Sequence, residues 1–144
     1  MKRRVQDLQP KLRFILEVMR PQTTLSNDER RESTRMHIKN IPFGITDWET
    51  VPTEIYTGDS GCATWRTRHF GEIRVRLVDY SPGYRANHWC AKGHIIFCLS
   101  GEMTTDLMDG RSFLLKAGQS YQVADDDGQH RSHTEVGARL FIVD

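Results

Sequence analysis

The feature that most constrains the fold is the alternation, from Ile38 onward, of short apolar runs with clusters of turn-forming residues. The turn clusters include Thr57 to Gly61, Ser81-Pro82-Gly83, Ser100-Gly101 and Asp109-Gly110. Short strands separated by such turns are typical of all-β sandwiches and barrels. We therefore predict an all-β domain with little helix. The expected strands cover roughly residues 62–66, 72–80, 86–90, 94–99, 102–107, 112–115, 120–124, 130–134 and 138–143.

One of these strands, in the segment EIRVRLVDY, carries arginines between apolar residues. Because side chains alternate across a strand, Ile73, Val75 and Leu77 are expected on one face. Arg74 and Arg76 then share the other face. We expect this arginine face to be solvated or to face an interface, and an arginine pair that binds an anion is the alternative.

Length and composition limit the classes of function. The chain has 144 residues, which suits one compact domain. Lys and Arg total 20 against 19 for Asp and Glu, so the basic field that binds nucleic acid non-specifically is missing. Cys62, Cys90 and Cys98 are too few, and odd in number, for a secreted disulfide framework, which favours a reducing cytoplasm. No apolar run approaches the roughly 18 residues of a membrane span.

The first 35 residues differ from the rest and are expected to form an N-terminal extension. Within residues 5–19, apolar positions recur at steps of three or four, which fits a short amphipathic helix interrupted by Pro10. The polar stretch PQTTLSNDERREST that follows is expected to be a linker. This helix could bind a membrane surface or a partner. Alternatively the extension is dispensable, and Met36 begins a self-contained domain over residues 36–144.

The segment NHWCAKGHIIFCLSGE, residues 87–102, concentrates side chains that bind metals. His88 and Cys90 are two apart, so an extended chain places both on the same face. The residues Ala91-Lys92-Gly93 suit a three-residue hairpin loop, which would place His94 across from Cys90 on the return strand. Imidazole and thiolate ligands suit zinc, iron, nickel or copper rather than magnesium or calcium. The segment therefore predicts a transition-metal site.

A fourth ligand is expected from the segment DDDGQHRSHTEV, which contains His130 and His133. Because these histidines are three apart, they point to opposite sides of an extended strand, so only one can face the interior. We choose His130, which follows the acidic turn directly. The competing interpretation is that each histidine is an ordinary polar residue without a ligand role. Cys62 and Cys98 are expected to pack as small hydrophobes.

Two segments of the chain resemble the paired motifs of the cupin family. SPGYRANHWCAKGHIIFCLSGE resembles the first cupin motif, and KAGQSYQVADDDGQHRSH resembles the second, with its glycine turn and single histidine. The run NHWC followed by KGH, with the final GARLFIVD, is most similar to the small proteins called DHCW-motif cupins. The resemblance covers about residues 36–144. It implies a single-domain cupin barrel, a double-stranded β-helix of jelly-roll type around a central pocket, commonly paired into homodimers.

The resemblance also implies a ligand set. His88 takes the place of the first cupin ligand, Cys90 that of the second histidine, His94 that of the glutamate and His130 that of the final histidine. Cys90 and His94 depart from the ordinary cupin residues, so iron or manganese chemistry cannot simply be inherited. Asn87 stands where the DHCW pattern has aspartate, which removes a negative charge beside the first ligand.

We expect a metal-binding cupin of unassigned activity that acts on, or binds, a small polar molecule in the barrel pocket. Whether it is an enzyme stays open, with dioxygenase-, isomerase- and hydrolase-like reactions as candidates. Tyr84, Asn87, Lys92 and Tyr121 are expected around the pocket or behind the ligands. The alternatives are a sensor or binding module without turnover, and a metal-free thiol site in which neighbouring imidazolium activates Cys90.

Overall fold

The computed structural model describes residues 38–144, and the expected extension, residues 1–35, lies outside the described residues. The described part is all β, as the sequence predicts, and contains no helix. A helix with the length and hydrophobicity needed to span a membrane is likewise absent from residues 38–144. The strands are β1 (Thr53–Thr57), β2 (Cys62–Phe70), β3 (Ile73–Tyr80), β4 (His94–Leu107), β5 (Ser112–Lys116), β6 (Ser120–Val123), β7 (His130–His133) and β8 (Ala138–Val143).

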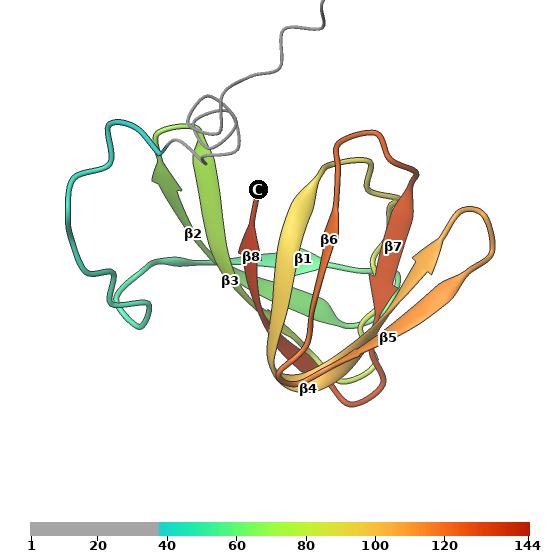
Figure 1. Ribbon diagram of the computed structural model, residues 1–144. Coiled ribbons are helices and arrows are strands. Elements are labelled where there is room, and N and C mark those ends of the chain that lie inside the picture. Colours follow the sequence, from blue (N-terminus) through green and yellow to red (C-terminus); the bar gives the residue numbers. More distant parts are fainter. Residues whose placement is uncertain (1–37) are drawn as a thin grey trace, which may run out of the picture. The chain divides into compact units, whose positions relative to one another are not determined.

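These strands form two antiparallel sheets that share the long strand β4 (Figure 1). The first sheet has the order β1-β2-β3-β8-β4-β6, in which β4 contributes its first half. In the second sheet, β5 and β7 pair with the two edges of the second half of β4. The two sheets face each other, because β4 runs through one and then through the other.

A bend near Gly101 allows β4 to belong to both sheets. The pairing of β4 with β8 shifts register between Cys98 and Ser100, which marks a bulge in the strand. Gly101 has a φ of 71°, a left-handed conformation that favours glycine. A Cβ at this position would collide with the carbonyl oxygen of Gly137. The bend therefore requires a residue without a side chain.

The structure corrects the predicted strands at three places. Residues 86–90 do not form a strand, and Cys90 makes only an isolated bridge. Residues 53–57 form β1, which was not predicted, because all five of its residues are exposed and the strand carries no apolar alternation. The predicted strands 94–99 and 102–107 are one strand, since Ser100-Gly101 forms a bulge rather than a turn.

The hydrophobic core lies between the two sheets. Its largest fully buried side chains are Val78, Leu140, Cys98 and Met103. They come from β3, β8 and the two halves of β4. Cys98 packs there as a small hydrophobe, and burial raises the pKa of its thiol. Because His94 lies four positions before Cys98 on β4, strand alternation turns His94 toward the same interior.

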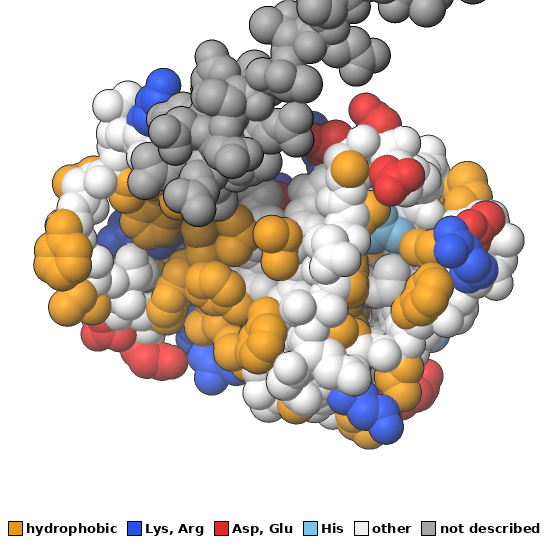
Figure 2. Space-filling view, in the orientation of Figure 1, with side chains coloured by type: hydrophobic (Ala, Val, Ile, Leu, Met, Phe, Trp, Pro, Cys, Tyr) orange, Lys and Arg blue, Asp and Glu red, His pale blue; other side chains and the backbone are white. Residues whose placement is uncertain are grey.

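The outer face of the first half of β4 is apolar and open to solvent. Ile95, Phe97 and Leu99 are 55%, 40% and 45% exposed and alternate with the inward residues of the strand. Figure 2 shows apolar side chains gathered over β3, β8 and this part of β4. The segment before β1 covers a part of the same face, where Trp48 makes an edge-to-face contact with Phe141 at 5.9 Å. Contiguous exposed apolar surface often marks an interaction site.

The bend at Gly101 gives a prediction for stability. Gly101→Ala should lower the free energy of unfolding by roughly 3 kcal/mol or more, because the Cβ adds a backbone collision to the cost of a positive φ. Gly110→Ala is the matched control, since Gly110 also has a positive φ but nothing lies within 4 Å of its Cβ position. It should cost only about 1–2 kcal/mol. Urea unfolding checks both values, and equal losses would contradict the proposed role of the bend.

Candidate metal centre

Three segments that are distant in sequence bring Cys90, His94 and His130 together. Cys90 lies in the irregular segment between β3 and β4, His94 begins β4, and His130 begins β7. Cys90 and His130 are directly paired, because each backbone N–H donates to the other's carbonyl oxygen, at 2.8 and 3.0 Å. His94 is placed from the other side, opposite Val123 of β6. The expected pairing of His94 with Cys90 across a hairpin is therefore wrong, although both side chains reach the same place.

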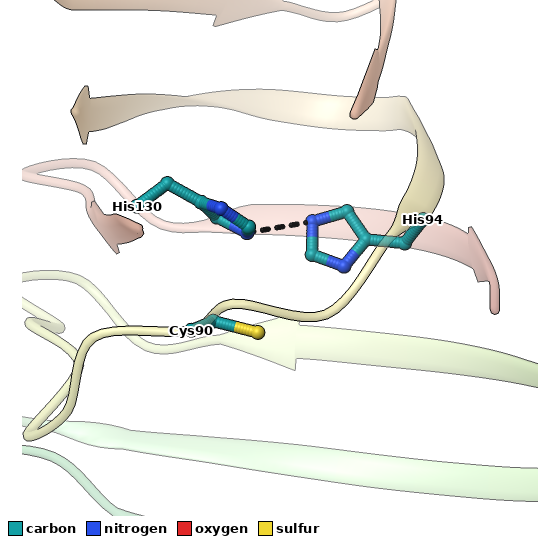
Figure 3. A group of neighbouring side chains, drawn as sticks. All are labelled: Cys90, His94 and His130. Carbon is teal, nitrogen blue, oxygen red and sulfur yellow. Dashed lines mark hydrogen bonds between the residues drawn. The ribbon is translucent and has the colours of Figure 1, made fainter. Parts of the chain in front are cut away.

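The ligand atoms of these three residues all lie within 4.8 Å of one another. The Nε2 atoms of His94 and His130 face each other at 3.0 Å, and the thiol of Cys90 points toward them (Figure 3). Ligands of a single zinc ion, with bonds of about 2.0–2.1 Å to nitrogen and about 2.3 Å to sulfur, lie roughly 3–4 Å apart. The separations and the types of donor therefore fit one transition-metal ion.

Both histidines are buried and favour the neutral state. Burial, together with the nearby His130 and Arg76, lowers the pKa of His94 to about 4. Burial also lowers the pKa of His130. The imidazole nitrogen that binds a metal must be unprotonated, so the pocket keeps both rings in the form that a metal requires.

His88, the fourth predicted ligand, lies at the edge of this group. Its side chain is exposed, but it lines the same small cavity as the other three. Its Nδ1 is 2.9 Å from the side-chain oxygen of Asn87, and Asn87 in turn donates to the carbonyl oxygen of Thr57 at 3.1 Å. Asn87 thus orients the His88 ring. His133 lies on the opposite face of β7 from His130, as strand alternation requires.

Comparisons with known proteins identify the fold. Neither a protein-family model nor a curated protein sequence matches the chain. Among solved structures, the polyketide cyclase RemF from Streptomyces resistomycificus is 18% identical, with a TM-score of 0.59 over 71% of this chain and 78% of that one. Fe(II)-HppE with the alternative substrate (S)-1-HPP is 16% identical, with a TM-score of 0.57 over 71% and 60%.

A sugar phosphate isomerase of the cupin superfamily from Silicibacter pomeroyi is 14% identical, with a TM-score of 0.54 over 69% of this chain and 74% of that one. The chain has the cupin fold. At these identities the likeness concerns the fold alone, and the DHCW subgroup stays a prediction. The predicted all-β cupin architecture is confirmed for the described residues.

The other predicted pocket residues occupy different layers of the cupin barrel. Tyr121, on β6, places its hydroxyl 3.3 Å from Nε2 of His94, and burial raises its pKa to about 12. Tyr84 is buried and stacks on Tyr80, with ring centroids 4.2 Å apart. Lys92 is exposed, and its backbone N–H donates to the sulfur of Cys90 at 3.4 Å. Tyr121 is therefore the one of these side chains that contacts the candidate ligands directly.

Arg76 lies in the barrel interior, contrary to the expectation that the arginine face of this strand is solvated. Alternation along β3 is as predicted, but this face turns inward, and Arg76 is 7% exposed. Its Nη2 donates to a carboxylate oxygen of Asp144 at 2.5 Å, and Nη2 of Arg74 reaches the same oxygen at 2.6 Å. The strand pattern could not reveal this orientation, because Val75 and Leu77 on the outer face are also buried.

Two cavities adjoin the candidate centre. A small one of about 70 Å³ is lined by the three candidate ligands and His88, and by Trp65 and Arg76 from β2 and β3. A larger one of about 700 Å³ lies against β5 and β6 and is lined in part by Leu107, Phe113, Leu115 and Val123. Tyr121 and His130 line both. The larger cavity also has polar lining residues, such as Gln122 and Asp127, and a small molecule in it could contact His130 of the candidate centre.

This geometry predicts different effects for two histidines of β7. His130→Ala should lower the affinity for zinc at least about a hundredfold, because it removes one ligand atom from the group and leaves the thiol with a single imidazole. His133→Ala should bind zinc as the parent does. Competition with a chromophoric zinc chelator measures both affinities. Equal affinity in the two variants would exclude His130 as a ligand.

Proposed function

We propose that the protein binds one divalent transition metal through Cys90, His94 and His130, and that a small polar molecule binds beside it in the barrel. The observation that carries this proposal is the convergence of three ligand-type side chains within 4.8 Å at a cavity. Neutral buried histidines support it, because they lose no proton when a metal binds. Thiolate and imidazole ligands favour zinc, iron, nickel or copper.

His88 is the proposed fourth ligand, reached from the edge of the cavity. An exposed ring held only through Asn87 can turn toward the group at small cost. Four protein ligands would describe a structural metal, whereas three leave a position for a substrate or water. An ion held by three protein ligands would supply Lewis-acid polarisation of a bound oxygen atom or activation of water. Tyr121 is placed to hold a proton or donate a hydrogen bond beside His94.

The reaction class stays open within this proposal. The names of the similar structures include a cyclase, an isomerase and a protein bound to Fe(II), so the shared fold selects no single chemistry. A dioxygenase-, isomerase- or hydrolase-like activity and a sensor without turnover all use the same centre. A reducing compartment, the cytoplasm, belongs to the proposal, because Cys90 must remain a free thiol to bind metal.

Replacement of the metal with cobalt tests the role of Cys90. The parent protein loaded with Co²⁺ should show an intense near-ultraviolet band from sulfur-to-metal charge transfer, and Cys90→Ser should lose this band. Cys62→Ser is the matched control and should retain it, since Cys62 lies outside the group. A parent protein that binds no metal, but whose Cys90 is selectively alkylated, would favour the alternative of a thiol site.

His88→Ala tests the fourth ligand separately. If His88 completes the ligand set, its loss should weaken metal binding at least about tenfold without abolishing it, because the three inner ligands remain. His69→Ala is the control, since His69 lies on β2 outside both cavities. The same chelator competition measures the affinity. Parent-like affinity of His88→Ala would leave a three-ligand site.

We also propose that the exposed apolar face of β4 pairs with a second copy of the chain. Ile95, Phe97 and Leu99 on this face support the proposal, because apolar side chains this exposed on one strand favour burial against a partner. Phe97→Asp should convert the dimer to a monomer, whereas Val136→Asp, 61% exposed in the parent and in the loop before β8, should not. Light scattering after size exclusion measures the mass. A monomeric parent protein would contradict the proposal.

A further inference from the structure

The small cavity beside the candidate ligands has an unusual balance of charge. Two arginines, Arg76 and Arg131, are among the residues that line it. Among the described residues that line this cavity there is no aspartate or glutamate. A bound divalent ion would add further positive charge. Asp144 and Asp59, which pair with Arg76 and Arg131 at 2.5 and 3.8 Å, do not line the cavity. The arginines are therefore the charged groups that a ligand inside it meets directly, and they favour a negatively charged ligand.

Arg76 is held rigidly in the wall of this cavity. Its guanidinium carbon lies 4.4 Å from the ring centroid of Trp65, which stacks the two side chains. One carboxylate oxygen of Asp144 accepts hydrogen bonds from both Arg76 and Arg74. A single side-chain carboxylate thus serves two guanidinium groups, and Arg76 keeps capacity for a second anionic partner.

Two buried donors in the wall lack an acceptor. Neither Nε of Arg76 nor the indole Nε1 of Trp65 has a hydrogen-bond partner among the described residues. A buried donor without an acceptor is costly, and such groups in native proteins commonly mark the place of a bound water or ligand. Because Nε of Arg76 and Nε1 of Trp65 are donors only, a complementary ligand must supply acceptors.

We propose that this cavity binds the carboxylate group of a small organic acid, with Arg76 as its anchor and Trp65 as a second donor. A planar carboxylate matches the guanidinium, and two oxygens can serve two donors. About 70 Å³ accommodates only a few water-sized groups, so the acid group itself fills the cavity. The remainder of the molecule extends past Tyr121 into the cavity of about 700 Å³.

A carboxylate ligand gives the proposed function its class of ligand. Only a contact between the acid and the metal rests on that proposed function. The arginine anchor itself belongs to the metal-free chain. The test therefore uses both metal-free and zinc-loaded protein, so that failure of the metal site and failure of the anion site give different results.

Acetate is the probe, and acetamide is its neutral counterpart of equal size. The chain has three tryptophans, so a nitrogen–proton correlation spectrum contains three indole signals, and Trp65→Phe assigns the signal of Trp65. Acetate should shift this signal in a saturable manner in both metal-free and zinc-loaded protein, because the indole N–H gains a charged acceptor. Acetamide should produce little shift. Equal shifts with both compounds, or none with acetate, would overturn the proposal.

Arg76→Met tests the anchor, because methionine keeps an unbranched apolar stem over Trp65 and removes the charge. Acetate should then bind about tenfold more weakly or worse, in metal-free and zinc-loaded protein alike. Arg139→Met is the matched control, since Arg139 pairs with Asp79 at 3.3 Å and does not line the small cavity. It should bind acetate as the parent does.

A second variant tests the cavity independently, in case Arg76→Met does not fold. Trp65→Phe keeps an aromatic ring beneath Arg76 and removes only the indole donor, and it should weaken acetate binding several-fold, as measured by calorimetry. Acetate binding that survives in both Arg76→Met and Trp65→Phe but disappears in His94→Ala would assign the anion to the metal alone and overturn the proposal. Binding that needs Arg76 in a chain without metal affinity would uphold the anchor and reject the metal centre.

Discussion

The bend in the middle of β4 is the constraint on which the rest of the structure depends. This one strand pairs with β8 and β6 in its first half and with β5 and β7 in its second half. His94 begins the strand, and Leu107 at its end pairs with His130. The bend at Gly101 turns the two halves toward each other, so both ends of β4 border the same interior. Cys90 is then held in place by its backbone pairing with His130.

The interior of this barrel is polar near the two ends of β4. Between the two sheets, nearer the bend of β4, it is apolar. Val78, Leu140, Cys98 and Met103 fill the space between the sheets. Above them, buried histidines stand near a buried arginine, and Arg76 contributes to the lowered pKa of His94. Burial and the charge of Arg76 disfavour a protonated imidazole. The neutral imidazoles can bind a cation, and the guanidinium of Arg76 can bind an anion.

Sequence patterns could predict those features that depend on local alternation. The run HIIFCLS predicted a strand over residues 94–99, which is the first half of β4 in the structure, and Cys98 was expected to pack as a small hydrophobe, as it does. The spacing of His130 and His133 implied that they occupy opposite faces of one strand, which the structure also has. The cupin resemblance supplied the connection between segments that no local pattern contains. For these reasons the fold and the residue types at the candidate site could be predicted from the sequence.

Features that depend on contacts between distant segments could not be predicted from the sequence. The bridge between Cys90 and His130 spans 40 residues of sequence, and the local pattern suggested a hairpin to His94 instead. The apolar alternation of β3 indicated the wrong inward side for Arg76, because Val75 and Leu77 lie on the outer face and are buried there too. Asp144, the partner of Arg76, is 68 residues away. The orientation of a strand within a barrel is a tertiary property, and these residues depend on it.

X-ray absorption spectroscopy of the protein, purified without a metal-chelating tag, tests the central claim most directly. We expect about one transition-metal ion per chain, with one sulfur and at least two imidazole nitrogens in its coordination sphere, at about 2.3 Å and 2.0–2.1 Å if the metal is zinc. A metal surrounded only by oxygen and nitrogen, or a chain that retains no metal after reconstitution with Zn²⁺ and Fe²⁺, would contradict it.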